Sequence, residues 1–206
     1  MGPDHLGIVR FADLPVIPWH NGGGVTREVV ASGASGTPVT SGGSDPQDFD
    51  WRVSIADVSQ PGPFSAFPGV DRVLTLVEGE RMELVIDGVV HVLGLHESLS
   101  FDGASRTSCS LPAGPTRDLN VMTRHDRLSA AVAVRDLSET RPVAVSGAQI
   151  LVLLTGTAVV AGADESQAHL EPLDAVCPSG IHVRLVTGSG RVAVVRIEDH
   201  HQTPAQ

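Results

Sequence analysis

Arginine and small polar side chains alternate with apolar ones in two short segments of the chain. In residues 51–56, Arg52 and Ser54 would share one face of a strand with Ala56, because successive strand side chains point to opposite sides. Asp118 and Asn120 would share a face in the same way. Guanidinium, hydroxyl, amide and carboxyl groups around one cavity would form a polar pocket for a small organic acid.

Arginine suits such a pocket because its guanidinium stays charged and donates paired hydrogen bonds to a carboxylate. Charge-assisted hydrogen bonds contribute roughly 1.5–3 kcal/mol each. Two of them with some apolar contact would support a dissociation constant of about 1 μM to 1 mM. The candidate ligand-binding residues are Asn21, Thr26, Arg27, Arg52, Ser54, Phe64, Ser65, Arg72, Asp118, Asn120 and Arg124.

Structural interpretations of these residues stay open beside the functional one. Asp71 with Arg72, or Asp118 with Arg124, could form an ion pair that closes a barrel. The glycines after Asn21 fit a tight turn that needs positive φ as well as they fit an anion-binding backbone. Phe64 could equally pack over a barrel mouth.

The overall charge excludes several classes of partner. All 14 cationic side chains of the 206 residues are arginine, against 24 carboxylates, which gives a formal net charge of -10. Nucleic acids and anionic membranes are therefore excluded as partners, because both attract clustered positive charge. Residues 1–20 lack the apolar core of a signal peptide, and no stretch is apolar enough to span a membrane. We expect a soluble, cytoplasmic protein.

Strand patterns recur along the chain, and helical periodicity is missing almost everywhere. Residues 82–87 alternate between apolar and polar, as in a half-buried strand. Residues 73–77, 150–154 and 192–197 are short apolar runs rich in β-branched side chains, as in fully buried strands. The predicted class is all-β, with residues 32–48, rich in Gly, Ser, Thr and Pro, as a flexible loop.

The two halves of the chain resemble each other in outline. A shift of 77 residues aligns residues 73–79 with residues 150–156, including a glycine at the end of each. The same shift aligns three further pairs, Asp87 with Asp164, Leu93 with Leu170, and Gly103 with Gly180. The pattern indicates an internal duplication of a small β-barrel.

Four ordered motifs carry a more specific resemblance. They are residues 18–28 (PWHNGGGVTRE), residues 49–56 (FDWRVSIA), residues 62–72 (GPFSAFPGVDR), and FDG at 101–103 followed by RDLNVMTR at 117–124. In this order they closely resemble the HutD/Ves family, most strongly over residues 6–127. Two positions depart from the family pattern, because His20 stands where Lys is usual and His125 where a second Arg is usual.

The resemblance implies a bicupin, with two tandem cupin-like jelly-roll barrels and little helix. The expected boundaries are residues 1–128 for the first barrel with its N-terminal strands, 129–198 for a smaller second barrel, and 199–206 for a polar tail. Family members encoded with histidine-utilisation genes are regarded as accessory or regulatory proteins. Urocanate or formylglutamate is the ligand that this context implies, and no cofactor is implied.

The metal-ligand positions of a cupin barrel are occupied by other residues here. Metal-binding cupins place His-x-His and then Glu ahead of the strand that ends in Gly. Counting back from Gly79 puts Arg72 at the Glu position, and Gln149 takes that position in the second half. Neither half has the ligand set that a divalent ion needs, so we expect no bound metal and no cofactor.

Three hypotheses follow for the function. The first is a metal-free bicupin that binds a small anionic metabolite in histidine utilisation. The second is a metal-free cupin isomerase or hydrolase that acts on a similar acid, with His20 and Asp118 as the residues to test. The third is a protein-interaction module whose barrel mouth is closed by side chains. Association of sheet edges into a homodimer stays open in each case.

Overall fold

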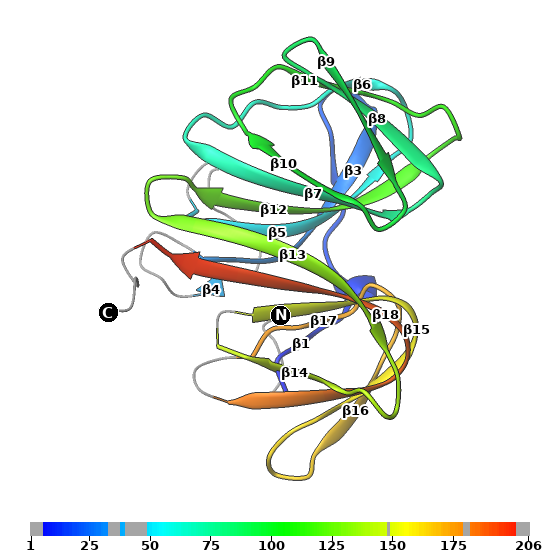
Figure 1. Ribbon diagram of the computed structural model, residues 1–206, viewed down its shortest axis with the longest axis vertical. Coiled ribbons are helices and arrows are strands. Elements are labelled where there is room, and N and C mark those ends of the chain that lie inside the picture. Colours follow the sequence, from blue (N-terminus) through cyan, green and yellow to red (C-terminus); the bar gives the residue numbers. More distant parts are fainter. Residues whose placement is uncertain (1–5, 33–37, 40–48, 148, 179–181, 201–206) are drawn as a thin grey trace. The chain divides into compact units, whose positions relative to one another are not determined.

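A computed structural model of the chain describes residues 6–32, 38–39, 49–147, 149–178 and 182–200. The chain divides into two compact units, which we call the first unit (Pro15–Ala130 with Asp199–Gln206) and the second unit (Met1–Leu14 with Ala131–Glu198). Strands build both units, and the described residues contain one helical element, the short 3-10 turn η1 (Phe11–Asp13). The predicted all-β class is therefore confirmed (Figure 1). Among the described residues, no helix is long and apolar enough to cross a membrane.

The first unit contains two antiparallel sheets. The larger sheet has the order β10-β7-β12-β5-β3-β2, with β4 beside β3, and the smaller sheet has the order β6-β11-β8-β9. The larger sheet consists of β2 (Ile17–Pro18), β3 (Gly24–Ser32), β4 (Pro38–Val39), β5 (Trp51–Val58), β7 (Val70–Glu78), β10 (Ser98–Asp102) and β12 (Thr116–Arg124). The smaller sheet consists of β6 (Gly62–Pro63), β8 (Arg81–Ile86), β9 (Val89–Gly94) and β11 (Thr107–Ser110).

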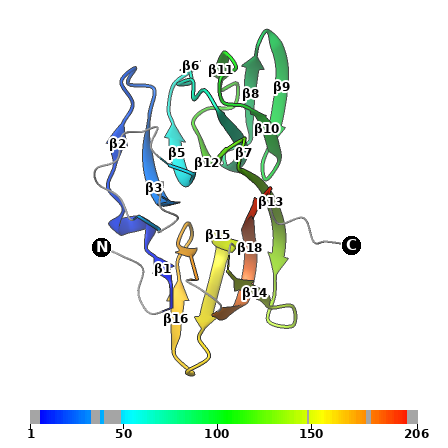
Figure 2. The same ribbon diagram turned by 90° about the vertical axis from the view of Figure 1, so that its left-hand side faces the viewer.

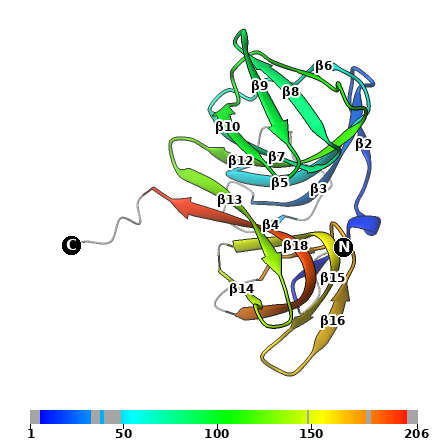
Figure 3. The ribbon, with the colours of Figure 1, turned by 45° about the vertical axis from the view of Figure 1, so that its right-hand side comes forward.

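An apolar core fills the space between these two sheets. Leu74 and Leu76 of β7 belong to the same buried cluster as Met82 and Leu84 of β8. Figure 3 shows β8 and β9 on the opposite side of this interior from β7, β12 and β5. Burial of these side chains supplies the main driving force for closing the first unit.

The register of the larger sheet decides which polar side chains share its inner face. Asn120 of β12 lies opposite Ser54 of β5 and Leu74 of β7. One step along the same face, Met122 lies opposite Arg52 and Arg72. Because Leu74 belongs to the core between the sheets, Arg52, Ser54, Arg72, Asp118 and Asn120 all lie on the inner face.

The second unit is one antiparallel sheet closed around its own core. The order is β1-β17-β15-β18-β13, with β14 beside β18 and β16 beside β15. Its strands are β1 (Ile8–Val9), β13 (Leu128–Leu137), β14 (Val143–Ser146), β15 (Gln149–Ala161), β16 (Gln167–Leu170), β17 (Ala175–Val176) and β18 (Val183–Asp199). Figure 2 shows the hairpin of β15 and β16, with β18 beside β15.

The boundary between the units differs from the expected one at the N-terminus. Residues 1–14 were expected in the first barrel, but β1 pairs with β17 of the second unit. The buried carboxylate of Asp174 holds this segment, because it accepts hydrogen bonds from Arg10 Nη1 at 2.6 Å and from Phe11 N at 2.9 Å. Within the loop expected at 32–48, Ser32 ends β3 and residues 38–39 form β4. Residues 33–37, 40–48 and 201–206 lie outside the described residues.

The 77-residue shift recurs in the backbone pairing of the two units. Leu74 pairs with Leu99 in the first unit, and Leu151 pairs with Val176 in the second. His96 has a φ of 70° and Leu173 a φ of 73°, which is uncommon for residues other than glycine. The backbone N–H of His96 donates to Leu76 O, and that of Leu173 donates to Leu153 O. Each unit therefore repeats the same turn between the same two strands.

Candidate functional site

The inner face of the first unit carries a group of polar side chains that we call the inner polar cluster. Its members come from the four neighbouring strands β3, β5, β12 and β7 and are Glu28, Arg52, Ser54, Arg72, Asp118 and Asn120. Four of these residues are almost fully buried, with exposed fractions of 3% for Ser54, 4% for Arg72, 0% for Asp118 and 5% for Asn120. Buried polar side chains are costly unless they are paired, so the cluster needs a specific explanation.

Arg72 on β7 provides the cluster's most buried positive charge. Its Nε and Nη2 donate to Asn120 Oδ1 at 3.4 and 3.0 Å, and its Nη1 donates to Ser65 O at 3.5 Å. A guanidinium carries five N–H donors, and these bonds within the described residues use three of them. Burial lowers the pKa of Arg72 to about 10, so the side chain remains charged at neutral pH.

Three phenyl rings surround the Arg72 guanidinium. Its central carbon lies 5.4 Å from the ring centre of Phe64, 5.7 Å from that of Phe67 and 5.1 Å from that of Phe101. Such stacking stabilises the cation and fixes the plane of its N–H groups. Two of the rings come from the loop between β6 and β7, in which Ser65 is exposed.

Asn120 connects Arg72 to the carboxyl group of Asp118. Its Nδ2 donates to Asp118 Oδ1 at 2.6 Å, while its Oδ1 accepts from Arg72. Asp118 Oδ2 is buried and has no hydrogen-bond partner among the described residues. Burial raises the pKa of Asp118 to about 7, although the Arg72 charge and the Asn120 hydrogen bond oppose this shift.

Arg52 adds a second guanidinium on the same face. Its Nε lies 3.0 Å from Glu28 Oε2, as an ion pair that lacks the alignment of a hydrogen bond. Arg52 and Arg72 both lie opposite Met122, on the two sides of β12, and the charge of Arg52 adds to the burial that lowers the pKa of Arg72. Two cations and two carboxyl groups therefore share one small region of the unit's interior.

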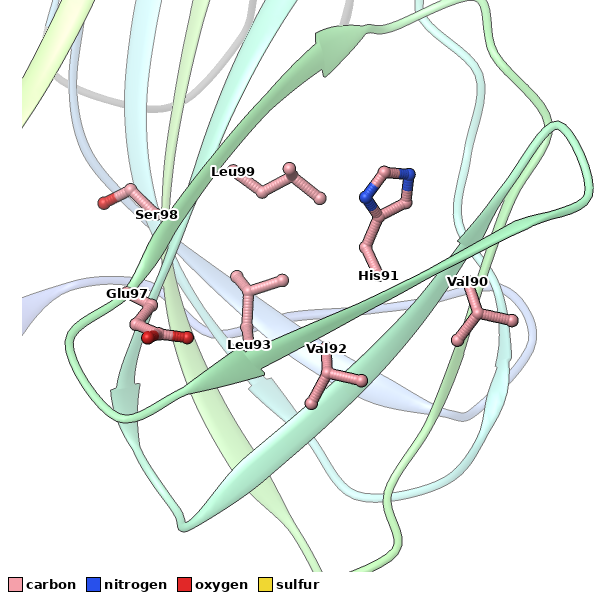
Figure 4. A pocket seen from close by; sticks show the side chains of 7 residues that line it. All are labelled: Val90, His91, Val92, Leu93, Glu97, Ser98 and Leu99. Carbon is pink, nitrogen blue, oxygen red and sulfur yellow. The ribbon is translucent and has the colours of Figure 1, made fainter.

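An open pocket of about 540 Å³ lies between β9 and β10 of the first unit. Figure 4 shows His91, Leu93 and Leu99 pointing into the space between these strands, whereas Val90 and Val92 point away from it. Leu99 pairs with Leu74, which in turn pairs with Asn120. Leu99 is therefore two strand spacings, about 10 Å, from Asn120, whereas Arg72 lies on β7, directly beside β10.

The second unit has apolar residues where the first has its polar cluster. Leu76 pairs with Asp118 in the first unit, and its repeat counterpart Leu153 pairs with Val192. By the same register Asn120 corresponds to Val194, and Arg72 corresponds to Gln149. Both valines are buried in the second unit's core. The repeated fold therefore does not itself require Asp118 or Asn120.

Three other residues predicted to bind the ligand, Asn21, Thr26 and Arg27, make structural contacts outside the inner polar cluster. Thr26 accepts a hydrogen bond from Trp19 Nε1 at 2.7 Å. Asn21 Oδ1 accepts from Gly23 N at 3.0 Å, which forms the expected turn. Arg27 lies on the opposite face of the sheet, where it pairs with Asp57 at 2.6 Å.

Arg124 and Asp71 also have contacts of their own. Arg124 Nε donates to Phe49 O at 3.0 Å, and its guanidinium stacks on the Phe49 ring at 5.5 Å. Asp71 faces His125 at 3.9 Å instead of pairing with Arg72. His20 is exposed on the turn between β2 and β3.

Several residues near the site were missed by the sequence patterns. Glu28 lies beside Arg52, and Cys109 of β11 is close enough to Asp118 for that carboxylate to help raise the thiol pKa, which burial raises most. His91 and Leu99 line the pocket. Pairing between distant strands brings these residues together, so local spacing gave no signal for them. Among the described residues, no group of three or more His, Cys, Asp or Glu side chains is arranged to hold a metal ion.

Comparison with protein-family models identifies the chain's relatives. The model of the HutD family matches residues 11–194. The chain belongs to the HutD family. Protein Ves from Citrobacter koseri is 42% identical over 131 residues, and an uncharacterized 21.2 kDa protein in the hutC 3' region of Pseudomonas putida is 36% identical over 126 residues. The alignments cover 62% of the length of each of these two relatives.

Two solved structures share the fold over nearly the whole chain. A conserved protein of unknown function from Pseudomonas aeruginosa PAO1 has a TM-score of 0.79 at 27% identity, covering 93% of this chain and 97% of that one. HutD from Pseudomonas fluorescens SBW25, in a formate condition, has a TM-score of 0.72 at 28% identity, covering 94% and 98%. A cupin 2 barrel protein from Leptotrichia buccalis, at 8% identity and a TM-score of 0.54 over 78% and 92% of the two chains, shows the cupin fold.

Proposed function

We propose that this HutD-family chain binds a small organic carboxylate inside its first unit, in an accessory or regulatory role in histidine utilisation. The observation that carries the proposal is Arg72, a buried guanidinium between three phenyl rings with two N–H donors left over from its bonds to described residues. A carboxylate fits two such donors better than a neutral ligand does. The pathway is supported by the family match and by the relative in the hutC 3' region.

The opening between β9 and β10 supports the same proposal. Leu99, which lines this pocket, pairs with the core residue Leu74, and Leu74 pairs with Asn120 of the inner polar cluster. Binding sites for small molecules combine such apolar walls with a few polar groups that fix orientation. Urocanate, with a planar body and one carboxylate, and formylglutamate, with two carboxylates on a short chain, both offer a carboxylate to such a polar group.

Calorimetric titration of the full chain with urocanate, formylglutamate and histidine tests the ligand class. We expect saturable heat with at least one of the two acids, at a dissociation constant of about 1 μM to 1 mM. The absence of heat with all three up to millimolar concentration would remove this ligand class. The proposal includes a cytoplasmic location, which fractionation of cells that express the chain would test.

Asp118 favours one second candidate, a metal-free enzyme acting on a similar acid. A carboxyl group with a pKa of about 7 suits general acid–base catalysis at neutral pH. In that case the acids would be consumed at a steady rate that survives a chelator and is lost in Asp118→Asn. Stable binding without consumption over hours would favour the binding protein.

A further inference from the structure

The unpartnered oxygen of Asp118 sets this carboxyl apart from an ordinary buried ion pair. In a buried pair, the carboxylate normally receives direct hydrogen bonds from the cation. Here the amide of Asn120 lies between Asp118 and Arg72, and Asp118 Oδ2 has no hydrogen-bond partner within the described residues. An ionised carboxylate in this position costs free energy that a protonated one avoids.

The second unit repeats the fold without a carboxyl group at the position that corresponds to Asp118. The counterpart of Asp118 in the second unit is Val192, and that of Asn120 is Val194. Both units nevertheless keep Leu76 and Leu153 at the paired positions, with the same backbone hydrogen bonds. A carboxyl group in place of valine is thus specific to the first unit, where the guanidinium groups are.

The charges of the inner polar cluster balance before any ligand is present. Arg52 and Arg72 contribute two positive charges, and Glu28 and ionised Asp118 contribute two negative ones. The charged groups that act on Asp118 are Arg72 of β7 and Asp57 of β5, and Asp118 in turn acts on Cys109 of β11. Arg52 of β5 lies on the same face and pairs with Glu28 of β3. Asp57 is itself paired with Arg27 and Arg117.

A carboxylate ligand would leave at least one uncompensated negative charge in this buried region, one for urocanate and two for the dicarboxylate formylglutamate. Like charges at close range in a low-dielectric interior favour protonation of one of the two carboxyl groups. We propose that the first unit takes up one proton together with its carboxylate ligand, and that Asp118 Oδ2 holds this proton. This inference rests on the proposed function and adds a regulation to it, because ligand affinity then depends on pH near neutrality.

The proton balance is simple. One proton leaves the solvent and binds Asp118 Oδ2, while no covalent bond of the ligand changes. Asp118 Oδ1 keeps its hydrogen bond from Asn120 in both states, so the geometry of the network persists. Because the pKa of Asp118 is raised to about 7, its carboxyl group is largely deprotonated at pH 8 in the ligand-free protein. It then gains the proton when the ligand binds. Affinity is therefore highest below pH 7 and falls as the pH rises above it.

Calorimetry with formylglutamate tests this inference, because this acid has no imidazole to titrate near neutral pH. Titrations at pH 8 in phosphate and in Tris, whose ionisation enthalpies differ, give the number of protons taken up. We expect at least about half a proton per ligand for the natural chain, and affinity weaker by about tenfold or more at pH 8.5 than at pH 6.5. Asp118→Asn, neutral at every pH, should take up no proton, should bind equally at both pH values, and should bind more tightly than the natural chain at pH 8.5. Glu80→Gln, on an exposed turn, is the matched control and should behave like the natural chain.

The possible outcomes separate this inference from the proposed function. Binding without proton uptake by the natural chain overturns the inference and leaves the proposed function standing. Proton uptake that persists in Asp118→Asn assigns the proton to another group and also overturns it. No binding at either pH overturns both. The proton count of the natural chain decides the question even if Asp118→Asn fails to fold.

Discussion

Arg72 and Asp118 carry opposite charges on the neighbouring strands β7 and β12, and the side-chain amide of Asn120 joins them. The amide accepts from Arg72 Nη2 at 3.0 Å and donates to Asp118 Oδ1 at 2.6 Å. This arrangement leaves donors on Arg72 and an acceptor on Asp118 without partners among the described residues. Unsatisfied buried groups cost stability, so an arrangement of this kind is expected where a ligand completes it.

Replacement of Arg72 should remove most of the binding energy for a carboxylate. We expect Arg72→Met to weaken the binding of formylglutamate or urocanate by at least about tenfold, because one charge-assisted hydrogen bond contributes roughly 1.5–3 kcal/mol. Arg106→Met, on an exposed loop position, is the matched control and should leave affinity unchanged. An Arg72→Met affinity within twofold of the natural one would show that this guanidinium does not hold the ligand.

Asp118 should make the free protein less stable as the pH rises. Its pKa in the folded state, about 7, lies above the ordinary aspartate value of 3.8, so between these two pH values the folded state holds a proton that the unfolded state releases. The stability that this group contributes is therefore complete below pH 4 and lost as the pH rises through 7. We expect Asp118→Asn to raise the free energy of unfolding in urea, by about 2–3 kcal/mol more at pH 8 than at pH 5. An equal effect at both pH values would contradict the raised pKa, and Glu80→Gln serves as the control.

The sequence predicted which side chains share a face of each strand, but not which residues on other strands they contact. Alternation in residues 51–56 and 118–122 placed Arg52 with Ser54, and Asp118 with Asn120, and the register of the sheet puts both pairs on one inner face. The same reasoning did not separate Arg27 from Thr26, although neighbouring strand residues must point to opposite faces. Arg27 accordingly pairs with Asp57 away from the cluster.

Transfer of the second unit's residues to the first should preserve the fold and abolish binding. The triple variant Arg72→Gln, Asp118→Val and Asn120→Val copies the counterparts Gln149, Val192 and Val194. The triple variant removes both charged ends of the Arg72–Asn120–Asp118 chain of hydrogen bonds together with the amide between them, which is often neutral or stabilising, whereas removal of one member leaves the others unpaired. We expect the triple variant to unfold at a urea concentration at least equal to that of the natural chain, with no heat on titration with formylglutamate. The single variant Asn120→Val should be destabilised by about 2–4 kcal/mol, and retained binding in the triple variant would place the ligand elsewhere.

The pocket between β9 and β10 should be the route to the cluster. Leu99→Trp adds a large ring at its floor, so formylglutamate should bind at least about tenfold more weakly or associate more slowly in stopped flow. Val16→Trp, at a side chain that is 49% exposed outside this pocket, is the control of equal size. Unchanged affinity and association rate in Leu99→Trp would mean that the ligand enters by another path.

The parts of the site that sequence reasoning missed all depend on contacts between distant strands. Cys109 and Asp118 lie on strands of different sheets, and His91 and Leu99 meet across an opening between two sheet edges. The boundary at residues 1–14 was wrong for a similar reason, because the two-residue strand β1 pairs with the distant residues Ala175 and Val176. In contrast, the duplication was visible because glycines such as Gly79 and Gly156 keep positive φ in both copies.

A crystal structure of the chain grown with formylglutamate at pH 6.5 tests the central claim most directly. We expect a ligand carboxylate inside the first unit, with at least one oxygen within hydrogen-bond distance of the Arg72 guanidinium. A ligand found in the second unit or on the outer surface, with the first unit's interior unchanged, would contradict it.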